Sequence, residues 1–394
     1  MSARFQIGCD IGGTFTDVAV VSDEGLVFTD KADTTPGDLS GGMLTALASV
    51  AAQVGLSLDE LLRATTRFVN GTTIVTNSIA TLTGARVGLV TTRGHGDILR
   101  IARSPRNEHR DHHRQLNIPQ IVPRERIVEV DERIDKKGTP VVALQEGDAR
   151  RAVEALVVQG GVESIAISLL WSFTNPAHEE LLARIVEEEH PGIFVSVGSR
   201  LHPVMREYER TMTTVLNAFT GLRVAAYTET IERELLRRGL PVPISFMQGF
   251  GGTLSAAEAR TKPIALVDSG PAGGVVGAAR LGAQIGVRDV IAADMGGTSF
   301  DVSVLPAGEI TVTQRVMLGE QFLTGLSKID VHPVGAGGGS LGWTDVRGAP
   351  RVGPQSAGAS PGPAAYGQGG KLPTVTDAAL VLGAIDQESF LGGR

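Results

Sequence analysis

The chain has 394 residues, of which 42% are hydrophobic and 20% are charged, and its formal net charge is −7. This length exceeds one ordinary core and indicates two or three domains, while the composition excludes an intrinsically disordered chain. The negative charge argues against nucleic acid as a partner, and no apolar run approaches the ~20 residues that a membrane-spanning helix needs.

The N-terminal stretch lacks the basic and apolar segments of a signal peptide and leads directly into an apolar run, Phe5 to Cys9. Cys9 is the only cysteine, which excludes an internal disulfide and fits a reducing compartment. We therefore expect a cytoplasmic protein with no membrane partner.

The first motif follows this run and reads Asp10-Ile11-Gly12-Gly13-Thr14-Phe15-Thr16-Asp17. Apolar residues on both sides predict a strand, a tight turn and a second strand. Gly12 and Gly13 let the backbone approach a ligand, and successive N–H groups with the hydroxyls of Thr14 and Thr16 suit an anion. The carboxylates of Asp10 and Asp17 suit the hard cation that accompanies a phosphate.

The next segments alternate between helix and strand. A helix is predicted from Pro36 to Val54, and strands over 67–71 and 87–91. Between the two strands, Thr72 to Ser78 carries hydroxyl and amide side chains that suit a helix N-terminus. These side chains either face an anion or cap and pack the helix, and the sequence favours neither.

A polar segment from Asn107 to Gln115 contains His109, His112 and His113. Their spacing places two imidazoles on one face of a helix, which is a metal-ligand geometry. Arginines interleave with them and would repel a cation, and prolines bracket the segment. A solvated or substrate-facing loop is the favoured interpretation, with a metal site as the alternative.

The middle of the chain predicts a layered sheet. A charged strand from Arg126 to Ile134 precedes a helix over 146–160, a strand over 164–170 and a helix over 176–190. A mostly helical stretch over 200–239 begins with the clustered charges Arg206, Glu207, Glu209 and Arg210. These charges either pair with one another along the helix or direct an arginine towards a bound anion.

A second glycine-rich region closes the series. Asp268 to Gly274 is predicted to form a turn before a helix from Val275 to Ile285, with the N–H groups of Gly273 and Gly274 directed at an anion. Close helix packing is the alternative. The motif then recurs as Asp294-Met295-Gly296-Gly297-Thr298-Ser299-Phe300-Asp301, again between apolar runs. Two such turns facing each other would hold a nucleotide triphosphate and its Mg²⁺.

The order of these motifs resembles that of the hydantoinase A/5-oxoprolinase family within the actin-like ATPases, which includes acetone and acetophenone carboxylase subunits. The matching stretches are IGCDIGGTFTDVAVV, NGTTIVTNSI, GLVTTRGHGDILRIAR, REYERTMTTVLNAF, SGPAGGVVGAA, ADMGGTSFDVSV, VGAGGGSLGW and VGPQSAGASPGPAAYG. Three features depart from the family pattern: the aromatic Phe250 in the MQGFGG stretch, the histidine-rich segment, and the end of the sequence before the family's later glycine-rich loop.

The resemblance implies a two-lobed α/β fold of the actin-like (ribonuclease H-like) type, with lobes over 1–200 and 201–394 and the second lobe incomplete. It implies that the glycines and threonines of both turns cradle ATP phosphates, and that Asp10 and Asp294 hold Mg²⁺ or position the attacking group. It also implies a small cyclic amide or ketone substrate and a hydantoinase B-type partner.

Three activities fit this resemblance. The first is ATP-dependent hydrolysis of a hydantoin or 5-oxoproline-like ring, through phosphorylation of the carbonyl oxygen. The second is the ATP-using subunit of a ketone carboxylase. The third is a nucleotide-binding subunit that does not turn over.

Overall fold

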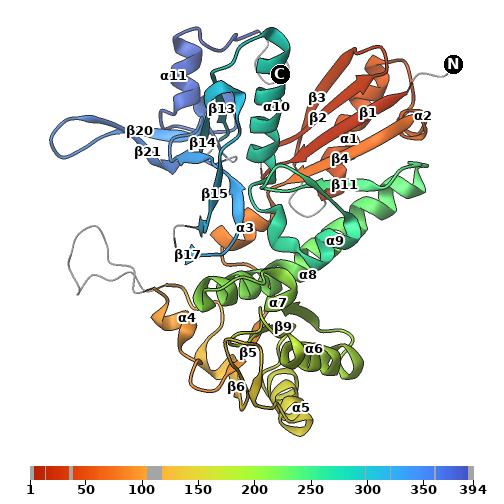
Figure 1. The fold of residues 1–394 in the computed structure, drawn as a ribbon. Helices are drawn as coiled ribbons and strands as arrows, with labels where there is room; N and C mark the ends of the chain where they lie inside the picture. Colours follow the sequence, from red (N-terminus) through yellow and green to blue (C-terminus); the bar gives the residue numbers. More distant parts are fainter. Residues whose placement is uncertain are drawn as a thin grey trace. The chain divides into compact units, whose positions relative to one another are not determined.

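A computed structural model describes residues 4–13, 15–34, 39–103, 118–297, 299–319, 321–358 and 361–388 (Figure 1). The chain forms two compact units. Unit 1 contains Met1–Gly270 and Thr313–Lys328, and unit 2 contains Pro271–Val312 and Ile329–Arg394. The sequence predicted two lobes that divide at residue 200. The two compact units are grouped by spatial contacts and do not test that division, which stays a prediction.

Unit 1 is built on a six-stranded sheet with the order β12-β11-β4-β1-β2-β3. Its strands are β1 (Phe5–Ile11), β2 (Phe15–Ser22), β3 (Val27–Asp33), β4 (Thr65–Thr72), β11 (Ile244–Met247) and β12 (Thr253–Ser255). Alternate residues of β1 are buried, which is the pattern of a strand with one face on the core. Helix α1 (Leu39–Gln53) packs on β2 and β3, so the predicted helix from Pro36 to Val54 is confirmed over those residues.

A second sheet of unit 1 is parallel, with the order β10-β9-β5-β6. Its strands are β5 (Val87–Thr92), β6 (Ile127–Val130), β9 (Ser164–Ser168) and β10 (Phe194–Val197). Helices α5 (Glu146–Glu154) and α6 (Ala177–Glu189) bury a shared apolar cluster with it. The predicted strand from Arg126 to Ile134 is wrong as one element, because β6 ends at Val130 and a separate hairpin forms from β7 (Arg133–Ile134) and β8 (Pro140–Val142).

The long helix α8 (Glu207–Arg237) joins the two sheets of unit 1 into one body. It packs against β9 and β10 and also against α1 and α9 (Ala256–Thr261) (Figure 1). Most of its first half is buried on all sides, which is why it lacks an amphipathic pattern. The short helices of the unit are α2 (Leu58–Arg63), α3 (Ile74–Ala80), α4 (Ile98–Ile101) and α7 (Gly198–Leu201).

Unit 2 carries a three-stranded sheet with the order β13-β14-β19 and a hairpin of β20 and β21. These elements are β13 (Val290–Met295), β14 (Phe300–Leu305), β19 (His332–Val334), β20 (Ser340–Thr344) and β21 (Pro350–Ser356). Helix α10 (Ser269–Ile285) buries Ala272 and Val275 against Leu305 of β14, and α11 (Val375–Val381) follows the hairpin.

Residues 313–328 leave unit 2 and pack into unit 1. They contain β16 (Met317–Leu318) and β17 (Phe322–Leu323), and also most of β15 (Val312–Gln314) and β18 (Ser327–Ile329). Val316, Leu318 and Phe322 are buried in the main apolar cluster of unit 1. Among the described residues, no helix is both long enough and apolar enough to cross a membrane.

Candidate functional site

The first glycine turn connects β1 and β2 at the end of the six-stranded sheet. Asp10 pairs with Asp17 and Ile11 with Thr16, so the predicted strand, turn and strand are confirmed. The N–H of Gly12 donates to the carbonyl of Phe15 (3.0 Å), which closes the turn. Because Asp10 and Asp17 are directly opposite in an antiparallel pair, their side chains lie on the same face of the sheet.

Asp10 lies between two glycines that come from distant parts of the sequence. A methyl group on Gly71, its register partner on β4, would lie 2.8 Å from Asp10 Oδ1. A methyl group on Gly270, in the first turn of α10, would lie 2.9 Å from Asp10 Oδ2. The carboxylate therefore occupies space that only glycine leaves open, at the positive end of a helix dipole.

Polar contacts fix the start of α10 beside this carboxylate. The hydroxyl of Ser269 donates to the carbonyl of Thr72 (2.8 Å) and accepts from the N–H of Thr72 (3.0 Å). The preceding residue, Asp268, accepts hydrogen bonds from Thr76 Oγ1 and Lys328 Nζ. Residues from α3, α10 and the 313–328 segment thus meet near the tip of β1, all within unit 1.

The other predicted groups of the first turn differ in how far they are engaged. A methyl group on Gly13 would lie 3.4 Å from Asn77 Nδ2, so α3 flanks the turn. Thr16 is fully buried and its hydroxyl bonds to Thr34 Oγ1 (3.0 Å). Asp17 forms an ion pair with Lys31 (3.1 Å). Thr14 lies outside the described residues.

The second turn repeats the geometry of the first. Asp294 pairs with Asp301 across β13 and β14, and the N–H of Gly296 donates to the carbonyl of Ser299 (2.9 Å). The predicted duplicate is therefore confirmed as a strand, turn and strand. Asp294, Gly296 and Gly297 are exposed in unit 2, and Thr298 lies outside the described residues.

A loop of unit 2 supports the second turn from behind. The N–H groups of Gly338 and Gly339 donate to the carbonyls of Gly296 (2.9 Å) and Gly297 (2.7 Å). A methyl group on Gly339 would lie 2.9 Å from the carbonyl oxygen of Gly297, so the approach requires glycine. Thr376, in the first turn of α11, donates to the carbonyl of Gly338 (2.9 Å).

The predicted turn from Asp268 to Gly274 is wrong, because α10 already begins at Ser269 and its first turns contain the glycines. Glycine and proline favour turns, but Pro271 falls within the first helical turn, where its missing N–H costs nothing. Gly273 and Gly274 are thus helical residues, and a methyl group on either would meet no described atom within 4 Å. Their role towards an anion stays a prediction.

In the charged cluster at the start of α8, Glu209 and Arg210 form their side-chain hydrogen bonds with residues outside the cluster. Glu209 has a buried carboxylate, 1% exposed, that accepts hydrogen bonds from Arg103 (3.3 Å at Nε) and Arg315 (2.8 Å). Arg210 is buried and donates to the backbone carbonyls of Val204 and Leu169 (both 2.9 Å). Arg206 precedes the helix and has φ of 97°, so the predicted pairing along the helix does not apply to it.

Several residues near the two turns were not predicted from the sequence. Gly71 and Gly270 border Asp10, Lys328 reaches Asp268, and Gly338 and Gly339 support the second turn. The strand register of β1 and β4 could have indicated Gly71, but nothing in the sequence links the others to their partners. The segment with His109, His112 and His113 lies outside the described residues.

Comparisons with known proteins cover both units. A family model described as Hydantoinase/oxoprolinase N-terminal region matches residues 6–190, and one described as Hydantoinase/oxoprolinase matches 210–394. The chain is 35% identical, over 99% of its length and 56% of the relative, to the caprolactamase subunit alpha of Pseudomonas jessenii. It is 37% identical, over 99% of its length and 54% of the relative, to the acetophenone carboxylase gamma subunit of Aromatoleum aromaticum.

The solved structures agree with this likeness. The ATP-dependent caprolactamase of Pseudomonas jessenii superposes with a TM-score of 0.84 at 34% identity, covering 96% of this chain and 55% of that one. This confirms the predicted α/β fold of the actin-like ATPase type. The chain spans about half the length of the curated relatives it matches.

Proposed function

Because the chain belongs to the hydantoinase/oxoprolinase family, we propose that it is the ATP-binding part of an enzyme that hydrolyses a small cyclic amide in the cytoplasm. The amide would be a hydantoin, a 5-oxoproline-like ring or a lactam. A hydantoinase B-type subunit is the proposed partner in a hetero-oligomer.

The observation that carries this proposal is the repeated turn. In both copies two aspartates are directly opposite across the hairpin. An equivalent backbone hydrogen bond closes each turn, from the N–H of Gly12 to the carbonyl of Phe15 and from the N–H of Gly296 to the carbonyl of Ser299. Glycine-rich turns with successive N–H groups form anion sites, and two such turns offer donors to more than one phosphate of a triphosphate. The proposed phosphate-binding residues are Gly12, Gly13, Thr14, Thr16, Gly273, Gly274, Gly296, Gly297 and Thr298.

The residues around Asp10 fit a magnesium ion carried by the nucleotide. Mg²⁺ binds one or two carboxylates together with phosphate oxygens and water. The glycines at 71 and 270 leave room beside the Asp10 carboxylate that any side chain would fill. Asp10 and Asp294 would hold the ion, and Asp17 lies on the same face as Asp10. When bound, the ion would neutralise developing charge on the phosphates.

The chemistry suits a poor electrophile such as an amide carbonyl. The carbonyl oxygen displaces ADP from the γ-phosphorus, which forms a C–O–P bond and breaks the β,γ P–O bond. Water then adds to the activated carbon, and the ring C–N bond breaks as the nitrogen takes up a proton, which leaves an acyl phosphate. A second water hydrolyses the acyl phosphate to the carboxylate and inorganic phosphate. In this scheme the chain's residues bind and orient the triphosphate, and Asp10 or Asp294 positions the attacking group.

The test is ADP release by the purified chain, alone and with the proposed partner, in the presence of 5-oxoproline, hydantoin or caprolactam. We expect a cyclic amide to accelerate ADP release, and Asp10→Asn to abolish that acceleration. The matched control is Asp23→Asn, in the exposed turn after β2. If none of these cyclic amides accelerated ADP release, the result would contradict the proposed amidohydrolase activity.

A ketone carboxylase is the second candidate, because the acetophenone carboxylase gamma subunit is as similar to the chain as the caprolactamase subunit. ADP release that requires bicarbonate and a ketone together would select it. A nucleotide-binding subunit without turnover is the third candidate, and it predicts thermal stabilisation by ATP with no ADP release under any condition.

A further inference from the structure

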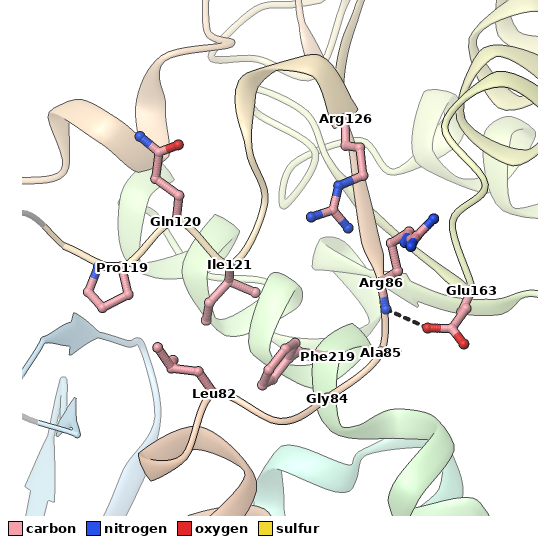
Figure 2. Close-up of a pocket in the computed structure, with 10 residues that line it drawn as sticks. All are labelled: Leu82, Gly84, Ala85, Arg86, Pro119, Gln120, Ile121, Arg126, Glu163 and Phe219. Carbon is pink, nitrogen blue, oxygen red and sulfur yellow. Dashed lines mark hydrogen bonds between the residues drawn. The ribbon is translucent and has the colours of Figure 1, made fainter.

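A cavity of about 400 Å³ opens in unit 1, away from the residues of the glycine turns (Figure 2). Its walls come from the segment before β5, the segment before β6 and the middle of α8. Phe219 of α8 forms the buried floor together with Ile121 and the partly exposed Leu82. Pro119 and Gln120 close one side, and Arg86, Arg126 and Glu163 lie on the other.

Among the residues that the structure describes, the guanidinium of Arg126 has no ion-pair partner. Figure 2 shows it extending from the residue that precedes β6 into the space above Ile121 and Phe219. Among the described residues, no carboxylate or carbonyl lies within hydrogen-bond or ion-pair distance of its side chain. A partly buried charge without a partner is unfavourable, so the site is suited to an anion.

Burial and the surrounding charges leave the pKa of Arg126 lowered, although the negative charge of Glu125 acts in the opposite direction. Arg86 also lacks a side-chain ion pair among the described residues, and the nearby carboxylate of Glu163 accepts the backbone N–H of Arg86 (2.7 Å). Burial, followed by the positive charge of Arg86, lowers the pKa of Arg126. The negative charge of a bound oxyanion would offset both effects.

The local backbone explains why the cavity stays open. The N–H of Ala85 donates to the carbonyl of Phe219 (2.9 Å), which holds the segment before β5 against α8. Gly84 passes so close to Phe219 that a methyl group on it would lie 2.5 Å from the carbonyl oxygen. Leu82 has φ of 52°, a conformation that turns the chain away from α3 and over the cavity rim.

We propose that this cavity binds a small organic anion, with its carboxylate or phosphate on Arg126 and its apolar body on Leu82, Ile121 and Phe219. A guanidinium pairs with either oxyanion through two parallel hydrogen bonds, while Phe219 and Ile121 recognise a flat or branched hydrocarbon. Gln120 adds a donor and an acceptor at the rim. This site is separate in its residues from the proposed nucleotide site and does not depend on it.

Isothermal titration calorimetry with benzoate, phenyl phosphate and inorganic phosphate tests the proposal on the full chain. We expect benzoate or phenyl phosphate to bind, and inorganic phosphate to bind at least tenfold more weakly because it lacks the apolar body. Tighter binding of benzoate would identify the preferred oxyanion as a carboxylate, and tighter binding of phenyl phosphate would identify it as a phosphate.

Three variants locate the site. Arg126→Gln should weaken binding of the organic anion at least tenfold while leaving the unfolding midpoint unchanged or higher, because the removed charge has no partner among the described residues. Leu82→Asn, which tolerates the positive φ, should weaken the organic anions several-fold and leave inorganic phosphate unaffected. Arg67→Gln, on the exposed part of β4, is the matched charge control and should change nothing.

Three results would overturn the proposal. One is that neither organic anion binds to the intact chain. Another is binding that Arg67→Gln weakens as much as Arg126→Gln, since this would reflect net charge alone. A lower unfolding midpoint in Arg126→Gln would likewise contradict it, because it would show that the charge is satisfied within the fold.

Discussion

At the scale of single residues, Asp10 illustrates how the fold reserves space for a carboxylate. Its two oxygens each lie where a Cβ on a neighbouring residue would intrude, at Gly71 and at Gly270. Neither glycine has the positive φ that usually requires glycine, since neither is among the positive-φ positions. Both are required by proximity alone.

The substitution Gly270→Ala tests this packing. The added methyl must displace the Asp10 carboxylate, so we expect at least a tenfold loss of ADP affinity in the presence of Mg²⁺, measured by calorimetry. Gly277→Ala is the matched control in the same helix, where a methyl group meets no described atom within 4 Å. It should keep affinity and add up to about 1 kcal/mol of stability through helix propensity. Equal affinity in both variants would contradict the role given to Asp10.

Glu209 provides a pH-dependent prediction. Burial disfavours its charged form, but the hydrogen bonds from Arg103 and Arg315 outweigh burial and hold its pKa below the ordinary value. A carboxyl with a lowered pKa stabilises the fold above its unfolded-state pKa of about 4.3, and this stability is lost as pH falls through the folded-state pKa.

We therefore expect Glu209→Gln to lower the free energy of unfolding by about 3 kcal/mol at pH 7, because it leaves two arginines without their shared carboxylate. The difference from the unsubstituted protein should shrink below about pH 4. Urea unfolding at several pH values measures it, with Glu24→Gln in the exposed turn after β2 as the control. A difference that stays constant from pH 7 to pH 3 would assign the effect to packing.

At the scale of elements, the 313–328 segment belongs to unit 1 although unit 2 residues precede and follow it in the sequence. Phe322 is 1% exposed within the apolar cluster that contains β1, α1 and α8 residues. The N–H of Gly325 donates to Thr213 Oγ1 of α8 (2.9 Å), and Lys328 pairs with Asp268 just before α10. The segment thus belongs to unit 1 by packing although the sequence places it inside unit 2.

Truncation of its buried aromatic side chain tests this assignment. We expect Phe322→Ala to lower the free energy of unfolding by about 3–5 kcal/mol, since it removes a buried ring and leaves a cavity. Val346→Ala, at a fully exposed position of the β20–β21 hairpin, should change it by less than 0.5 kcal/mol. Chemical denaturation of both variants makes the comparison, and a small effect at Phe322 would contradict the assignment of the segment to the core.

At the scale of the whole molecule, the two glycine turns belong to different compact units. The prediction that both turns bind the same nucleotide therefore requires residues from both units. If they grip one polyphosphate, calorimetry should find one ATP per chain, and Asp10→Asn and Asp294→Asn should each weaken that single event at least tenfold. A stoichiometry of two, or a variant that removes one of two separate binding events, would show that each turn acts alone.

The sequence by itself determined the parts of this protein that depend on local chemistry. Strand, glycine turn and strand around residues 10 and 294 follow from the flanking apolar runs and the backbone freedom of glycine, and α1 and α6 lie within the helices predicted over Pro36 to Val54 and over 176–190. The order of the motifs also indicated the family. These features arise from neighbours in the chain, so one sequence suffices to find them.

Only the tertiary structure decided which distant residues meet. It placed Gly71 and Gly270 against Asp10, gave Glu209 the partners Arg103 and Arg315, and started α10 at Ser269 in spite of its glycines. Local propensity disfavours a helix there, but the contact of Gly270 with Asp10 and of Ser269 with Thr72 fixes its first turn. Long-range packing and hydrogen bonds outweigh intrinsic preferences of about 1 kcal/mol per residue, and such contacts leave no periodic trace in the sequence.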